Sequence, residues 1–196
     1  MSPYILSIDL ETVFHAEYVK RLFPKIQITP RLLDTVLTGL VEILKILENN
    51  RAKATFFVVG ELLEHEPTIR ELLVDAGHEI AFHGYYHDLL WKISPGEFVK
   101  HVQLFKSLLK RERCLGFRAP SFSLDNRSRW AIEILAREGF VYDSSIFPAK
   151  TPLYGSNRAP TKPYRPSSRD VYQHDDEGPI IAVSYTHLTL PTTERV

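Results

Sequence analysis

Two histidines and two acids in this 196-residue chain have the types and spacing of a metal-dependent hydrolytic site. His83 and His87 are four positions apart, so both imidazoles would point to one face and could share a divalent ion if the chain turns into a helix there. Of Asp9 and Glu11, one carboxylate could bind the ion while the other acts as a base. The histidine spacing alone is more typical of ordinary surface or core residues. The metal hypothesis therefore depends on where the strands place these side chains.

Further polar and aromatic residues follow other apolar runs. An isolated arginine such as Arg118 is usually a salt-bridged surface residue, but beside a carboxylate cluster it can hold a catalytic carboxylate ionised and oriented, and we favour that role. Asp143 ends a later strand, and the two serines after it are interpreted as a turn, so no catalytic triad is expected. Tyr85 and Tyr86 are more typical of packing than of sugar binding, although either could stack on a pyranose ring.

The elements expected to position these residues alternate between strand and helix. Apolar runs predict six strands, at 4–9, 54–59, 79–82, 114–117, 140–142 and 180–183. Capping signals predict helices that open at Thr29, Pro67, Ser94 and Asp125. Such alternation implies a parallel sheet with right-handed crossovers, and the number of units favours a closed or nearly closed barrel over an open sheet. We therefore expect an α/β fold, a distorted (β/α) barrel, with its polar strand ends on one face.

Composition narrows the class of protein. Hydrophobic residues make up 44% and charged residues 24% of the chain, and acids and bases balance at 24 each, so we expect one globular domain without a nucleic-acid-binding field. The single cysteine, Cys114, excludes an internal disulfide and is expected in the core. No run is long enough for a membrane span, and the start lacks the features of a signal peptide, so we expect a cytoplasmic protein. Residues 150–178 are expected to form a long surface connection.

Several of these segments, taken in order, resemble the motifs of the polysaccharide deacetylase family, also described as NodB homology and similar to carbohydrate esterase family 4. The resembling stretches are 7–11, 55–60, 77–87, 117–120 and 142–145. The combination of Gly-His-Glu-Ile, His-x-x-x-His and Arg-x-Pro is highly specific. The Asp-x-Glu opening resembles the cytoplasmic-type subgroup associated with exopolysaccharide gene clusters. The resemblance implies a distorted (β/α) barrel.

The resemblance also implies roles for individual residues. Asp9 matches the catalytic base, Arg118 the residue that positions it, and His83 and His87 the metal ligands. Most members have adjacent aspartates where this chain has Asp-Leu-Glu, so Glu11 and Asp9 could exchange roles, and we favour Glu11 on the metal. The expected cofactor is a divalent ion, zinc by preference, and the expected partner is an N-acetylated glycan substrate. Substrate contacts are expected from five residues: Tyr85, Tyr86, Phe117, Pro120 and Tyr142.

The last residues depart from the family pattern. Members carry a late histidine that protonates the leaving amine, and neither His174 nor His187 can be assigned to it. Residues 184–196 resemble translated adapter sequence, and barrels of this kind need roughly 250 residues. We therefore expect a deacetylase domain over 1–183 that is incomplete at its C-terminus, followed by a non-native tail over 184–196.

Two other functions stay open. The chain could open a cyclic amide, as allantoinase-like members of the same superfamily do, or it could be a non-catalytic carbohydrate-binding derivative of the fold. The retained histidines and acids argue against the first, and Asp9 with Arg118 serves no evident purpose in the second. The sequence identifies neither the particular glycan nor the oligomeric state.

Overall fold

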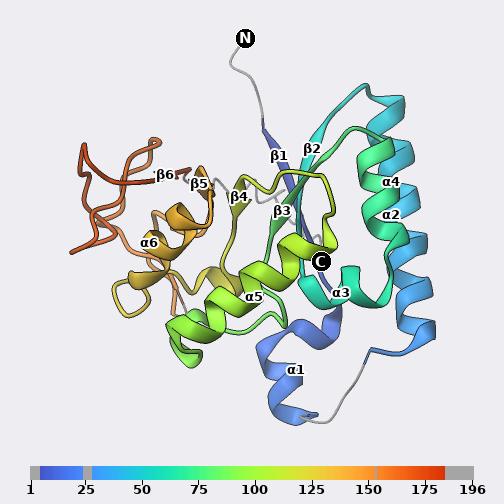
Figure 1. Cartoon of the computed structure of the whole chain (residues 1–196), viewed down its shortest axis with the longest axis horizontal. Helices are drawn as coiled ribbons and strands as arrows, with labels where there is room; N and C mark the ends of the chain where they lie inside the picture. Colours follow the sequence, from blue (N-terminus) through green and yellow to red (C-terminus); the bar gives the residue numbers. More distant parts are fainter. Residues whose placement is uncertain (1–4, 24–27, 153, 184–196) are drawn as a thin grey trace, which may run out of the picture.

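A computed structural model describes residues 5–23, 28–152 and 154–183 of the chain (Figure 1). Six strands form one parallel sheet in the order in which they occur along the chain. They are β1 (Leu6–Leu10), β2 (Ala54–Val58), β3 (Glu79–Phe82), β4 (Gly116–Phe117), β5 (Tyr142–Asp143) and β6 (Ile181–Ala182). All six lie within the predicted apolar runs or one residue from them, so the strand prediction is confirmed.

Helices connect the strands: α1 (Glu17–Leu22), α2 (Pro30–Asn49), α3 (Gly60–His65), α4 (Thr68–Asp75), α5 (Pro95–Leu108) and α6 (Trp130–Arg137), with 3-10 turns η1 (Val13–His15), η2 (Leu90–Lys92) and η3 (Pro120–Phe122). The predicted caps of α2 and α5 are confirmed. The Thr29 hydroxyl accepts the Leu32 N–H, and Ser94 and Glu97 form a capping box.

The helices differ from the prediction in two respects. The helix predicted to open at Asp125 begins instead at Trp130, because the Asp125 carboxylate accepts the N–H of Arg127 and forms a separate turn. The short helices α1 and α3 were not predicted at all, because neither six-residue segment is long enough to show a helical period.

The core lies between the sheet and the helices, and aromatic rings dominate it. Phe82 on β3 is fully buried and its ring contacts four others, those of Phe98, Phe105, Phe117 and Phe140. Cys114 is buried as predicted. Side chains alternate across a strand, so a core residue is followed by one that faces the other side of the sheet. Because of this alternation, His83 after Phe82 and Arg118 after Phe117 face away from the core.

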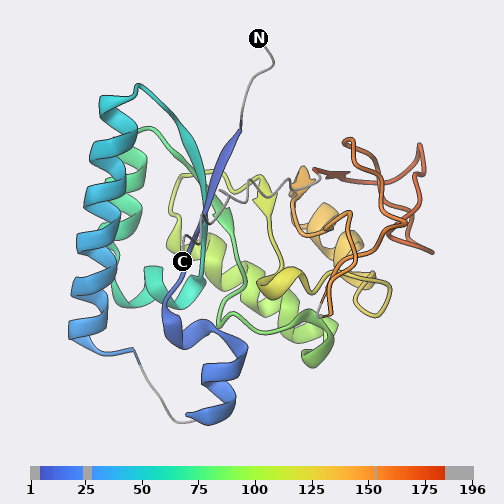
Figure 2. The same ribbon diagram turned by 180° about the vertical axis from the view of Figure 1, so that it is seen from behind.

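The sheet is an arc that is not closed, since β1 and β6 are not paired with each other in the described part of the chain. Sequential strand order is the order of a (β/α) barrel, whereas a doubly wound sheet reverses direction. The barrel-type fold is therefore confirmed, as an open parallel sheet. Figure 1 shows α5 in front of the sheet and α2 beside α4 at one side, and Figure 2 shows the arrangement from behind.

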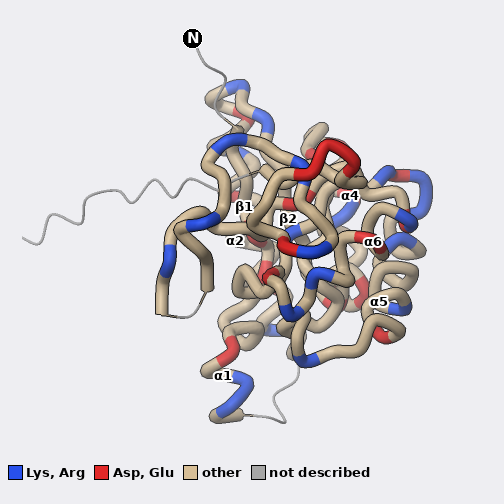
Figure 3. Tube along the Cα trace, turned by 90° about the vertical axis from the view of Figure 1, so that its left-hand side faces the viewer, with Lys and Arg blue, Asp and Glu red and all other residues tan. Residues whose placement is uncertain are grey.

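In its described residues, 150–152 and 154–178, the predicted connection is irregular chain and carries buried side chains of its own. Tyr164 pairs with Ala182 in an isolated antiparallel bridge, and Tyr164 and Val171 are buried. Basic and acidic residues are interspersed along the trace without a broad field of one sign (Figure 3). Within the described ranges, no helix combines the length and apolarity needed to cross a membrane. The predicted tail over 184–196 lies outside the described residues.

Candidate metal centre

The carboxyl ends of the strands carry the polar residues to one place. The His83 N–H donates to the Val58 carbonyl at 3.0 Å, and the Arg118 N–H donates to the Phe82 carbonyl at 2.9 Å, so each polar residue extends a strand by one ladder bond. Asp9 is the second-last residue of β1, and Glu11 directly follows the end of the strand. The expected convergence of these residues is thereby observed.

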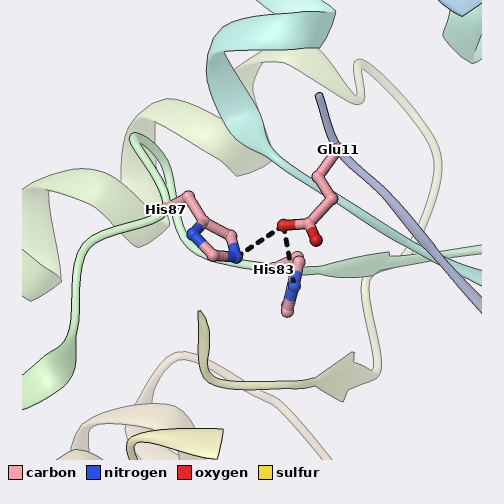
Figure 4. Close-up of side chains that lie close together, drawn as sticks. All are labelled: Glu11, His83 and His87. Atoms are coloured by element: carbon pink, nitrogen blue, oxygen red, sulfur yellow. Dashed lines mark ion pairs between the residues drawn. The ribbon is translucent and has the colours of Figure 1, made fainter. Parts of the chain in front are cut away.

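Glu11, His83 and His87 form the one cluster of three potential metal ligands found among the described residues. One ligand atom from each lies within 4.8 Å of the other two. The Nε2 atom of His87 is 2.6 Å from Glu11 Oε2, and the Nε2 atom of His83 is 3.9 Å from the same oxygen. Figure 4 shows both rings directed at the carboxylate. Two imidazoles and a carboxylate are a ligand set typical of hydrolytic zinc sites.

The ring of His83 is fixed in the form that a metal ligand needs. Its Nδ1 lies 2.8 Å from the Arg118 carbonyl, which can only accept a hydrogen bond, so Nδ1 carries the proton and the Nε2 lone pair faces Glu11. Burial lowers the pKa of His83 to about 4 despite the opposing effect of Asp9. The imidazole is therefore neutral at physiological pH, as coordination requires.

The charge on Glu11 is also favoured. Burial raises the pKa of this carboxyl, but the hydrogen bond with His87 and the neighbouring imidazoles lower it by more, and the net pKa lies below its ordinary value. An ionised carboxylate beside a neutral imidazole can accept a divalent cation without first losing a proton.

A loop, and not the helical turn considered from the spacing, brings the two histidines together. The loop reverses through Gly84 at φ +76° and His87 at φ +56°. Positive φ is strained for a residue with a Cβ, and such strain occurs at functional sites where the surroundings enforce it. The turn places the two ring centroids 5.0 Å apart.

Arg118 holds Asp9 at the edge of the cluster. It is almost fully buried, and its Nη1 donates to Asp9 Oδ1 at 2.5 Å. Its Nε donates to the Ser144 carbonyl, and its Nη2 donates to the hydroxyls of Ser7 and Ser144. Its guanidinium lies 4.0 Å from the centroid of the Phe57 ring. The other oxygen of Asp9, Oδ2, lies 3.8 Å from His83 Nε2. One carboxylate oxygen is thus bound to the arginine, and the other faces the metal cluster.

A second buried acid fixes the chain that carries Arg118. Asp143 is fully buried, and both its oxygens accept hydrogen bonds from Ser145, one from the N–H and a very short one from the hydroxyl. The Ser145 oxygen in turn accepts the Ala119 N–H at 2.7 Å. Burial raises the pKa of Asp143 to about 6 against the lowering effects of these hydrogen bonds and of Arg118. The serines predicted as a simple turn therefore clamp the neighbouring strand end.

The pocket over the cluster has a volume of about 400 Å³, and its walls come from three parts of the chain. Its lining includes the polar residues of the cluster: Asp9, Glu11, His83, His87 and Arg118. The remaining lining residues come from α1 and η3 and from the residue before each of them: Ala16, Glu17, Tyr18, Arg21, Ala119, Ser121 and Phe122.

None of the five predicted substrate-contact residues lines this pocket. Phe117 is in the core because it precedes Arg118 on the strand and faces the opposite side. The Tyr142 hydroxyl donates to Glu79, at the amino end of β3 and away from the pocket. Tyr85 is buried against Gly60, Tyr86 lies against His101, and Pro120 packs at Gly84. Their predicted substrate contacts have no support in this geometry.

Two features of the site were missed from the sequence. Tyr18 and Arg21 on α1 line the pocket, and no periodic pattern marked that segment. His15 is buried beside His87, with ring centroids 5.7 Å apart. A histidine followed by an amphipathic segment carries no recognisable motif, so only the spacing Thr12-x-x-His15, which forms a capping box here, could have marked the residue.

Comparison with known proteins identifies the family. The family model described as polysaccharide deacetylase matches residues 34–138, more than half of the chain. A peptidoglycan deacetylase-like protein of Gibberella zeae is 35% identical over 122 residues, which are 59% of this chain and 35% of that protein. A peptidoglycan-N-acetylglucosamine deacetylase of Bacillus cereus is 31% identical over 117 residues, 56% of this chain and 38% of that protein. The matched part thus spans little more than a third of these curated relatives.

Solved structures show the same fold. A crystal structure from Mycobacterium smegmatis, assigned to the polysaccharide deacetylases, aligns with a TM-score of 0.64 at 22% identity and covers 93% of this chain and 58% of that chain. At this identity the likeness concerns the fold, and the match to the family model carries the assignment. Together with the predicted motifs, which lie at the strand ends as expected, these findings show that the chain belongs to the polysaccharide deacetylase family.

Proposed function

We propose that the chain is a metal-dependent hydrolase that removes N-acetyl groups from amino sugars of a polysaccharide or its precursor. The observation that carries the proposal is one pocket that holds three potential metal ligands and the carboxylate of Asp9. One oxygen of Asp9 lies 3.8 Å from His83 Nε2, and the other accepts a hydrogen bond from the buried Arg118. A ligand cluster alone would also fit a structural ion. A separately held carboxylate beside it is what hydrolysis needs in addition.

The ligand set fits a divalent ion, and zinc is the ion we propose. His83 offers the lone pair of a neutral imidazole, and Glu11 offers an ionised carboxylate. Three protein ligands leave further coordination positions open, which is the pattern of catalytic rather than structural zinc sites. When bound, the ion would polarise the acetamide carbonyl and lower the pKa of a water molecule.

Asp9 is the proposed base, and Glu11 is the proposed ligand. Asp9 Oδ1 is occupied by Arg118, which leaves Oδ2 directed toward the cluster and able to accept a proton from an attacking water. Glu11 Oε2 lies 2.6 Å from His87 Nε2, and a shared ion between the two atoms would take the place of this direct contact. Arg118 keeps the base ionised and fixes its orientation through four hydrogen bonds, because a planar guanidinium can bind several acceptors at once.

The substrate sugar is proposed to lie against α1. Tyr18 lines the pocket and is 65% exposed, so its ring is available to stack on a pyranose. In the part of the chain that the structure describes, His83 and His87 are the histidines that line the pocket, and both are proposed ligands. The acid that protonates the leaving amine is therefore not assigned. The N-acetylglucosamine named for the relative from Bacillus cereus supports an N-acetylated amino sugar as substrate.

Acetate release from chitooligosaccharides and from peptidoglycan fragments tests the proposal. The purified chain should release acetate, lose this activity in the presence of a chelator and regain it with added zinc. His83→Ala should be inactive, whereas His65→Ala, an exposed histidine on α3, should behave as wild type. Chelator-resistant acetate release would refute the metal-dependent mechanism.

The two alternatives give different results in the same assays. A cyclic-amide hydrolase would open allantoin or a related ring and release no acetate. A carbohydrate-binding derivative would retain glycan affinity after chelation and after His83→Ala without turning over either substrate. The fold cannot separate these activities, because one scaffold supports several reactions.

A further inference from the structure

The loop that carries His87 is held by groups from two other elements. The N–H groups of Gly60 and Glu61, at the start of α3, donate to the carbonyls of Gly84 and Tyr85, each at 2.9 Å. Lys20 on α1 donates to the next two carbonyls, a very short bond to Tyr86 and one of 3.3 Å to His87. Every carbonyl from Gly84 to His87 therefore has a donor, which accounts for the persistence of a loop with strained residues.

His15 joins these elements beneath the metal site. It is 2% exposed, and its ring lies over that of His87 with 23° between the planes. The Thr12 N–H donates to its Nδ1 at 2.9 Å, so Nδ1 is unprotonated and Nε2 carries the hydrogen. Nε2 lies 2.8 Å from Glu61 Oε1 and donates to it. Both ring nitrogens are thus engaged, and neither lone pair is available to a metal.

We propose that His15 is a positioning residue for the metal centre. Held by its hydrogen bond to Glu61, His15 fixes the His87 ring in the orientation for coordination and does not itself bind the ion. The inference rests on the proposed metal site. His87 has a strained backbone and lies outside the helices and strands, so its ring orientation depends on the groups packed against it. His15 provides one of these surfaces, and its two hydrogen bonds prevent the ring from rotating. Groups that orient metal ligands typically affect metal affinity by 10- to 100-fold.

Glu61 is the part of this arrangement that can be tested with least risk to folding. Its side chain is 20% exposed, so replacement leaves no large cavity. Glu61→Gln retains an oxygen that can accept the His15 N–H, whereas Glu61→Leu removes the acceptor and leaves a buried donor without a partner. The pair of variants therefore separates the hydrogen bond from the charge and from the bulk of the side chain.

Zinc affinity of the full chain, measured by competition with a chromophoric chelator, tests the proposal without reference to catalysis. Glu61→Leu and His15→Ala should weaken zinc binding by about 10- to 100-fold. Glu61→Gln should stay within about threefold of wild type, because it keeps the acceptor. His65→Ala, on the same helix and exposed, serves as the matched control. The Co(II) absorption spectrum should also change in Glu61→Leu and not in Glu61→Gln.

The possible failures can be told apart. If the wild-type chain binds no stoichiometric zinc, the proposed function and this inference both fall. If it binds zinc and Glu61→Leu binds it equally well with the same Co(II) spectrum, only the role of His15 is refuted. A purely structural role would lower the unfolding temperature of the metal-free variants and leave the dissociation constant unchanged. Should His15→Ala fail to fold, the two Glu61 variants still decide the question.

Discussion

Asp143 should make the protein less stable as the pH rises, and Asp143→Asn should remove this effect. The carboxyl is fully buried, and its pKa of about 6 exceeds the ordinary value of 3.8. A group whose pKa is raised by folding contributes stability that is present below the unfolded pKa and is lost as the pH rises through the folded pKa. Each pKa unit corresponds to about 1.36 kcal/mol, so the complete effect is about 3 kcal/mol.

Urea unfolding of the wild type and of Asp143→Asn, both in chelator, measures this difference. Between about pH 4.5 and about pH 7.5, the free energy of unfolding of the wild type should fall by about 2 kcal/mol relative to the variant, since part of the titration lies below this range. The amide substitution also changes the hydrogen bonds with Ser145, which shifts the difference by a constant amount. Parallel pH profiles for the two proteins would show that folding does not raise the pKa of Asp143. Asp34→Asn, at an exposed position on α2, is the surface control.

Three further substitutions test the loop at Gly84, the role of Arg118 and the proposed sugar contact of Tyr18. Gly84→Ala should destabilise the protein by more than about 1 kcal/mol in thermal unfolding, because φ is +76° and the new Cβ would lie 2.8 Å from Pro120 Cγ. Gly39→Ala, at a helical position with open space around it, should be neutral or stabilising. Arg118→Lys should lower kcat/KM for acetate release by about 100-fold and leave zinc affinity within about threefold, because an ammonium cannot reproduce the hydrogen bonds to Asp9, Ser7 and Ser144. Equal losses of kcat/KM and of zinc affinity would contradict a role through Asp9. Tyr18→Ala should raise KM several-fold with little change in kcat if its ring binds the sugar in ground and transition states alike, and an unchanged KM would place the sugar elsewhere.

Local signals in the sequence were sufficient for most of the fold. The leucine period after Thr29-Pro30 marked α2, and the Ser94 to Glu97 spacing marked the start of α5. Short apolar runs located the six strands, because buried parallel strands are apolar along their length. Alternation of strands and helices then implied the sequential parallel order. The connection at 11–29 was not resolved into elements, because neither η1 nor α1 is long enough to show a period.

The sequence predicted those residues of the candidate site that lie at the carboxyl end of a strand. Asp9, Glu11, His83 and Arg118 come together because parallel strands end at the same edge of the sheet. The orientation of His87 could not be predicted, since it depends on positive φ at a residue that rarely adopts it. The contact of His15 with Glu61 joins positions 46 residues apart, and only the folded chain reveals it. The residues expected to contact substrate do not line the pocket, because Phe117 and Tyr85 are buried elsewhere and the Tyr142 hydroxyl donates to Glu79.

Zinc K-edge X-ray absorption of the zinc-loaded full chain, combined with metal analysis, shows directly whether Glu11, His83 and His87 bind one divalent ion. We predict one zinc per chain with two imidazole nitrogens at about 2.0 to 2.1 Å and oxygen ligands at a similar distance, and loss of the bound zinc in His83→Ala. Bound zinc without imidazole scattering, or stoichiometric zinc retained by His83→Ala, would rule out this ligand set.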